Sequence, residues 1–138
     1  MNSNETEKKN KEYMQGQNKP GDIINCIIEG IKEKKGEEIV KLDLKNLEQA
    51  VTDYFIICHA NSNRQVDAIA DHVEKNLRKQ YQEHVLHKEG TSQAEWILLD
   101  YANIVVHVFK KDVRNTYKLE ELWGDGELTR ISDLKEQE

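Results

Sequence analysis

The stretch Trp96–Phe109 constrains the fold more than any other part of this chain. Two runs rich in β-forming residues, Trp96–Leu99 and Ile104–Phe109, flank the four residues Asp-Tyr-Ala-Asn. Two such runs around a short polar link predict a β-hairpin, in which the chain turns back on itself. The sequence therefore indicates an antiparallel strand pair in the C-terminal third of the chain.

The two faces of this hairpin differ in chemistry. Side chains alternate along a strand, and an even-numbered loop keeps the two strands in phase. One face then carries Trp96, Leu98, Asp100, Val105, His107 and Phe109. The opposite face is aliphatic apart from a terminal Tyr. Because burial alone does not require Trp, Asp, His and Phe together, the mixed face is the candidate site.

Length and charge narrow the function classes. The chain has 138 residues, which predicts one domain with a core of its own, and a formal net charge of -6. An acidic chain gains nothing from counterion release on DNA or RNA, whereas a basic protein surface would attract it. No apolar run has the length of a membrane span, and residues 1–10 match neither a secretory signal nor a transit peptide. We therefore expect a cytoplasmic protein without direct nucleic-acid specificity or a membrane partner.

The N-terminal half predicts a helix, two strands and a second helix. Residues 1–21 are polar and predict a disordered tail. Asp22 is the expected cap of a helix with a stripe of isoleucines that ends before Gly36. Ile39–Leu44 predicts a strand followed by a turn, and Asp53–Cys58 predicts a central strand buried on both faces. Ser62–Gln65 has the form of a capping box and opens the second helix; a phosphate cradle at this point is less favoured, because the loop has no glycine.

The C-terminal half predicts an edge strand within His84–Gly90, the hairpin, and a short helix over Lys110–Lys118. The last apolar patch is Leu119–Trp123, and residues 126–138 predict a flexible acidic tail. The order of elements indicates an α/β fold with helices packed on a mixed β-sheet, because the hairpin is antiparallel while the second helix suggests a parallel crossover.

No complete catalytic or metal site is visible in the sequence. Cys26 and Cys58 lie far apart and are interpreted as two buried thiols. His84 and His87 point to opposite faces of a strand, so no metal is expected. A nucleotidyltransferase would need two closely spaced carboxylates on a strand and a Gly-Ser turn, and neither is present. We therefore predict a protein that is not an enzyme and needs no cofactor.

Three interpretations of the mixed face stay open. Asp100 and His107 could act as general acid and base, but no Ser or Cys is placed as their nucleophile. A structural His bonded within the sheet, with an Asp that fixes the turn, is favoured over catalysis. A protein-binding face suits the composition better still, with Trp and Tyr as anchors and Asp and His for polar specificity. That face could contact another protein or a second copy of the chain.

Five blocks of the chain carry a family likeness. They are Thr52–Ile57, Asn61–Val66, Glu95–Tyr101, Val105–Phe109 and Arg114–Asp125. In this order they resemble the successive blocks of the ribosome silencing factor (Iojap) family, and the likeness covers residues 22–125. The resemblance implies a domain related to the nucleotidyltransferase fold but without its catalytic carboxylates.

The resemblance also implies a function. Members of this family are translational repressors that bind the large ribosomal subunit through its fourteenth protein and block joining of the small subunit when nutrients are scarce. Carried over by position, the partner-binding residues are Trp96, Leu99, Asp100, Tyr101, His107, Arg114 and Tyr117. Of these, Asp100 and Tyr101 rank above Trp96 if the partner docks at the turn end of the hairpin. The chain departs from the family pattern at Ala102-Asn103, where Gly-Asp is common, and at His59-Ala60, where a small Ser-Gly type pair is common.

Overall fold

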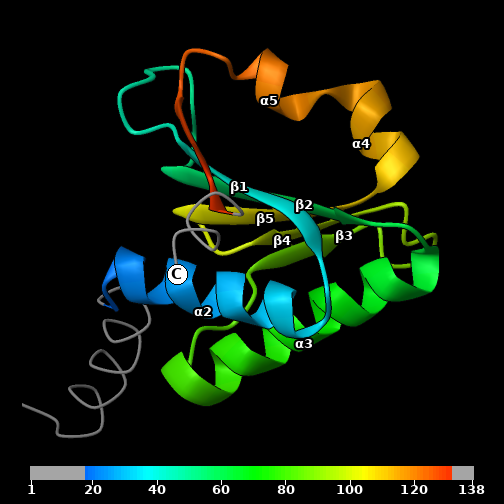
Figure 1. Cartoon of the computed structure of the whole chain (residues 1–138). Helices are drawn as coiled ribbons and strands as arrows, with labels where there is room; N and C mark the ends of the chain where they lie inside the picture. Colours follow the sequence, from blue (N-terminus) through cyan, green and yellow to red (C-terminus); the bar gives the residue numbers. More distant parts are fainter. Residues whose placement is uncertain (1–17, 132–138) are drawn as a thin grey trace, which may run out of the picture.

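A six-stranded mixed sheet forms the middle layer of the molecule (Figure 1). The computed structural model describes residues 18–131. Across the sheet the strand order is β3-β4-β5-β2-β1-β6. Their bounds are β1 Glu37–Asp43, β2 Tyr54–Ala60, β3 His87–Glu89, β4 Trp96–Asp100, β5 Ile104–Lys110 and β6 Glu127–Arg130. The predicted α/β class with a mixed sheet is confirmed, since β2 and β5 are parallel while the other neighbours are antiparallel.

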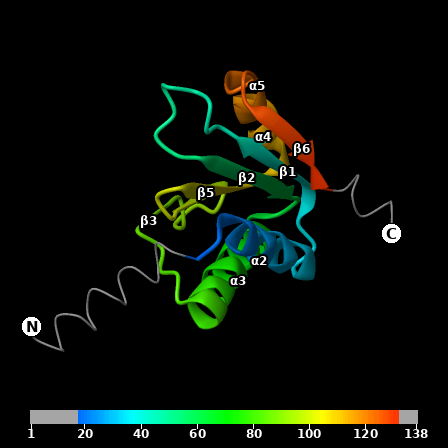
Figure 2. The ribbon, with the colours of Figure 1, turned by 90° about the vertical axis from the view of Figure 1, so that its left-hand side faces the viewer.

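Two long helices, α2 (Pro20–Glu33) and α3 (Asn63–Tyr81), cover one face of the sheet, as Figures 1 and 2 show. The isoleucines of α2 are buried against this face, as the periodicity predicted. The helix begins earlier than expected, however. Lys19 is the N-cap and Pro20 opens the helix, while Asp22 lies in the first turn. Proline suits this position because the first helical N–H has no intrahelical partner.

Half of the predicted capping box is present at the start of α3. The Ser62 hydroxyl accepts a hydrogen bond from the backbone N–H of Gln65 at 3.1 Å. The Gln65 side chain does not return to Ser62. Instead its amide donates to the carbonyl oxygens of Lys34 and Lys35, just beyond the end of α2. The glutamine therefore ties the two helices together where a local cap was expected.

The predicted central strand and hairpin are both confirmed. In β2, every residue from Phe55 to Ala60 is buried, and the strand lies between β5 and β1. In the hairpin, Trp96 pairs with Phe109 and Asp100 with Val105. This register leaves Ala102 and Asn103 as a two-residue loop, so the predicted alternation of faces holds. The predicted edge strand and buried thiols are also present.

Two short helices, α4 (Lys111–Tyr117) and α5 (Leu119–Leu122), stand over the other face (Figure 1). They cover β2, β1 and the inner part of β5. Because β4 lies farther from the centre of the sheet, its side chains on this face remain half-buried. The sheet thus has one face that is covered along its length and one that is partly open.

The end of the fold lies beyond the predicted boundary at residue 125. Glu127–Arg130 forms β6 and pairs with β1 from Val40 to Asp43, so this part of the expected tail belongs to the sheet (Figure 2). Ile131 is buried against the main core. The expected N-terminal tail lies outside the described residues up to residue 17. Within the described range, no helix has the length and hydrophobicity needed to span a membrane.

Candidate functional site

A row of half-buried side chains on β4 forms the open part of the sheet. The burial of this strand alternates strictly, so that Trp96, Leu98 and Asp100 are half-buried while Ile97 and Leu99 are buried. We call Trp96, Leu98 and Asp100 the β4 row. A flat sheet face that presents an aromatic, an aliphatic and an acidic group can bind protein through apolar contact and charge. The row is therefore the core of the candidate site.

The first residue of the row is held in place by a buried histidine. The Trp96 indole Nε1–H donates to Nδ1 of His107 at 3.0 Å. The indole ring also stacks on Phe109, with ring centroids 4.7 Å apart. Both contacts restrict the ring, so that Trp96 presents its remaining surface without losing much side-chain entropy when a partner binds. Trp96 is thus a suitable anchor.

His107 itself is part of the core rather than of the surface. Its side chain lies within an aromatic cluster that includes Phe55, Trp96 and Phe109, and it is only 3% exposed. Because Nδ1 accepts from Trp96, the imidazole proton lies on Nε2, which has no hydrogen-bond partner within residues 18–131. Burial lowers the pKa of His107 to about 3. This agrees with the structural interpretation of His107 and removes it from the surface that a partner can reach.

At the turn end of the hairpin, Asp100 and Tyr101 lie on opposite faces of the sheet. Asp100 accepts a hydrogen bond from the backbone N–H of Ala102 at 2.8 Å and so fixes the turn, as predicted. Tyr101 points the other way, into the core under α2 and α3, where burial raises the pKa of its hydroxyl. Leu99 is fully buried in the same core. Burial therefore argues against direct partner contact by Tyr101 and Leu99, and the ranking of Tyr101 above Trp96 loses its basis.

Leu98 is the functional candidate that the sequence reasoning missed. It lies between Trp96 and Asp100 on the same face, opposite His107 in the strand register. The alternation of strand side chains already placed it with those two residues, but residue matching by family position selected Leu99. The signal was thus present in the sequence as the two-residue period.

A shallow pocket adjoins the β4 row. It has a volume of about 190 Å³, and its lining includes Trp96, Val113, Tyr117 and the loop side chains Ser92, Gln93 and Glu95. The ring of Tyr117, from α4, lies 4.9 Å from that of Trp96 between centroids and is 59% exposed as a residue. Tyr117 is accordingly the predicted site residue that is most accessible. Together Trp96 and Tyr117 form an aromatic surface with an acidic side chain beside it.

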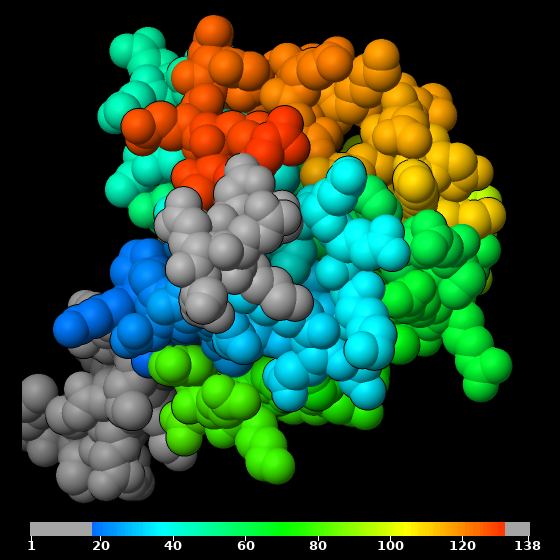
Figure 3. All heavy atoms as spheres, viewed as in Figure 1, coloured from blue at the N-terminus to red at the C-terminus, as the bar shows by residue number. Residues whose placement is uncertain are grey.

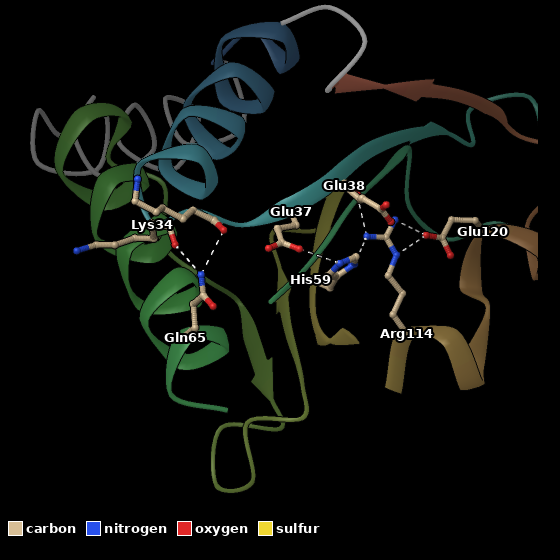
Figure 4. Close-up of polar contacts among 8 residues, drawn as sticks. Lys34, Glu37, Glu38, His59, Gln65, Arg114 and Glu120 are labelled. Carbon is tan, nitrogen blue, oxygen red and sulfur yellow. Dashed lines mark hydrogen bonds and ion pairs between the residues drawn. The ribbon is translucent and has the colours of Figure 1, made fainter. Parts of the chain in front are cut away.

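Arg114 lies on the same helix as Tyr117 but faces the sheet (Figure 4). It is 8% exposed, and its guanidinium donates to the backbone oxygen of Glu38, to Nδ1 of His59 and to the carboxylate of Glu120. With these bonds Arg114 joins β1, β2, α4 and α5. Arg114 therefore has a structural role. The family resemblance implied a contact with the partner, and the burial of Arg114 does not suit that role.

A larger pocket lies beside Arg114, between the two short helices and the sheet edge. Its volume is about 410 Å³, and α4, α5, β1 and β6 all contribute to its lining. Figure 3 views the molecule from this side, with the atoms of α4 and α5 above those of β1. The lining mixes Arg130 and Lys118 with Glu38, Glu120 and Glu121, so the pocket carries no dominant charge.

The described residues offer no assembled catalytic or metal centre. No group of three or more His, Cys, Asp or Glu side chains in this range is arranged to hold a metal ion. The Cys58 thiol is fully buried, and burial raises its pKa to about 12, which disfavours the reactive thiolate. Asp100, the proposed acid or base partner of His107, is engaged in the turn. The fold therefore accounts for both side chains, Cys58 in the core and Asp100 in the turn.

Comparison with known proteins adds a family to this description. A family model described as "Ribosomal silencing factor during starvation" matches residues 17–138. The ribosomal silencing factor of Bacillus subtilis is 45% identical over 112 residues, covering 79% of this chain and 91% of that protein. Its counterpart from Halalkalibacterium halodurans is 41% identical over 113 residues, covering 82% and 95%.

The chain is also similar to a solved structure and to a more distant relative. A crystal structure of a protein from Chromobacterium violaceum has a TM-score of 0.73 at 34% identity and covers 78% of this chain and 88% of that one. A mouse protein named "Mitochondrial assembly of ribosomal large subunit protein 1" is 26% identical over 115 residues, covering 79% of this chain and 50% of that protein.

The fold is thus an α/β domain whose candidate functional surface is a partly open sheet face. Within that class, the chain belongs to the ribosomal silencing factor family, as the five sequence blocks predicted. The role of this family is the regulation of translation by ribosome silencing.

Proposed function

We propose that this protein binds the large ribosomal subunit through its fourteenth protein and sterically blocks association with the small subunit. By this occlusion it lowers translation under nutrient limitation, and its place of action is the cytoplasm. The proposal draws on the family, on the name of the mouse relative, and above all on the open β4 row next to Tyr117.

The chemistry of the β4 row suits a ribosomal protein. The chain carries a net charge of -6, and Asp100 and Glu95 supply carboxylates at the two ends of the row. Ribosomal proteins are typically basic, so opposite charge would favour association and orient the partner. Leu98 and the exposed side of Trp96 supply the apolar contact that such an interface needs at its centre.

Two variants that each introduce an aspartate test this proposal. Leu98→Asp introduces a charge in the middle of the β4 row, and Val51→Asp introduces the same charge at a fully exposed valine on the β1–β2 loop. In cosedimentation with purified large ribosomal subunits, we expect Leu98→Asp to weaken binding at least about tenfold, equal to about 1.4 kcal/mol. Val51→Asp should bind like the wild type.

Stability measurements separate docking from folding. Because Leu98 packs against the core of this face, the melting temperature of both variants is measured and binding is compared at a temperature at which each is fully folded. Absence of wild-type binding to the large subunit would refute the proposed function. Equal binding by wild type and Leu98→Asp would refute the β4 row as the docking surface.

A further inference from the structure

The hydrogen bonds around Arg114 determine the protonation state of His59. Nη1 of Arg114 lies 3.0 Å from Nδ1 of His59 and 2.8 Å from the carbonyl oxygen of Glu38 (Figure 4). A guanidinium only donates hydrogen bonds, so Nδ1 must accept with its lone pair. His59 is therefore neutral, with its proton on Nε2, which lies 3.6 Å from the carboxylate of Glu37.

A second proton on His59 is incompatible with the seated arginine. It would place an N–H on Nδ1 toward the N–H of Arg114 and bring two cations within hydrogen-bond distance. Lys111 of α4 adds to this repulsion, whereas Glu37 and Glu38 of β1 oppose it. Burial and then Arg114 are the largest effects, and together with these smaller ones they lower the pKa of His59.

Arg114 is the one buried side chain among the described residues of α4. The helix has seven residues and is joined to α5 by Lys118 alone. Glu120 of α5 accepts from Nε of Arg114 at 2.7 Å, so the same guanidinium also anchors the next helix. Tyr117, one turn after Arg114, holds its ring against Trp96. Loss of the Arg114 contacts would release α4 and separate Tyr117 from the β4 row.

We propose that His59 is a positioning residue for the docking surface: it accepts a hydrogen bond from Arg114, holds α4 and Tyr117 over the sheet, and releases them when it is protonated. This inference rests on the proposed function for its consequence in binding, but its structural part concerns the free protein. If His59 has an ordinary pKa of about 6.5 once released, the equilibrium between released and seated α4 rises by up to about 30-fold between pH 7.5 and pH 5.0.

The binding experiment compares the wild type with His59→Asn and His72→Asn. The Oδ1 atom of asparagine can accept from Arg114 where Nδ1 did, and it does not titrate. His72 lies on α3, on the other side of the sheet, and serves as the matched control. Affinity for purified large ribosomal subunits is measured from pH 7.5 to pH 5.0, and the ratio to His59→Asn at each pH cancels changes in the ribosome itself.

We expect the affinity of the wild type and of His72→Asn to fall about threefold or more relative to His59→Asn as the pH is lowered. A ratio that stays constant would overturn the inference and leave the proposed function intact. In parallel, NMR of the free wild-type protein should show that contacts between the Tyr117 and Trp96 rings weaken as His59 titrates. If these contacts persist when His59 is protonated, the inference is overturned. This outcome does not depend on whether the variants fold or whether the protein binds the ribosome.

Discussion

The buried His107 predicts a specific loss of stability in acid. Its pKa is lowered from 6.5 to about 3 because the imidazole is surrounded by aromatic side chains. Between these values the folded protein keeps the ring neutral, while the unfolded chain binds a proton. Each pH unit below 6.5 therefore lowers the free energy of unfolding by about 1.4 kcal/mol, until the folded pKa is reached.

The expected size of this effect follows from the two pKa values. From pH 7.0 to pH 4.5, His107 alone should remove about 2 to 3 kcal/mol from the free energy of unfolding. Urea denaturation of the wild type and of His107→Asn at both pH values measures it. The asparagine can still accept from the Trp96 indole but does not titrate, so the variant should lose about 2 to 3 kcal/mol less than the wild type over this interval.

The comparison needs a control because other groups also titrate in this range. His87 is exposed on the edge strand, and His87→Asn is the control that carries the same substitution outside the core. A lower stability of His107→Asn at both pH values would only report lost packing. If wild type and His107→Asn lose the same free energy between pH 7.0 and pH 4.5, the burial argument is refuted.

Two further predictions concern backbone conformation. Ala102 has φ +74° in the hairpin loop, so Ala102→Gly should raise the free energy of unfolding by about 0.5 to 1 kcal/mol in urea denaturation; an unchanged or lower value would contradict the strain. Gly90 has φ +85°, and an added Cβ would lie 1.9 Å from the carbonyl oxygen of Trp96, so Gly90→Ala should cost about 2 kcal/mol or more. Gly21→Ala, which meets open space, is its control and should cost nothing.

Much of the fold was predictable because its signals are local. The isoleucine stripe of α2, the Ser62 cap of α3 and the register of the hairpin each depend on residues close together in sequence. β6 was missed because Glu127–Arg130 is mostly exposed and polar, without the alternation that marks a strand. It becomes a strand by pairing with β1, which lies more than eighty residues earlier in the chain.

The candidate site was predictable only in part. The two-residue period placed Trp96, Leu98 and Asp100 on one face, and this arrangement is present. The period does not tell which parts of a face other elements will cover, because covering depends on contacts between distant segments. His107 and Arg114 were predicted as contact residues, although both are buried. Aromatic rings of β2, β4 and β5 surround His107, and contacts to β1, β2 and α5 bury Arg114.

The sequence by itself determined the strand alternation, the helix stripes and the family, since each is written in neighbouring residues or in ordered blocks. Only the tertiary structure decided which members of the mixed hairpin face meet solvent. The physical reason is that α4 and α5 cover the centre of the sheet and leave its β4 side open. The same packing brings Arg114 to His59 across 55 residues, a contact that depends on distant segments of the chain and that no local pattern indicates.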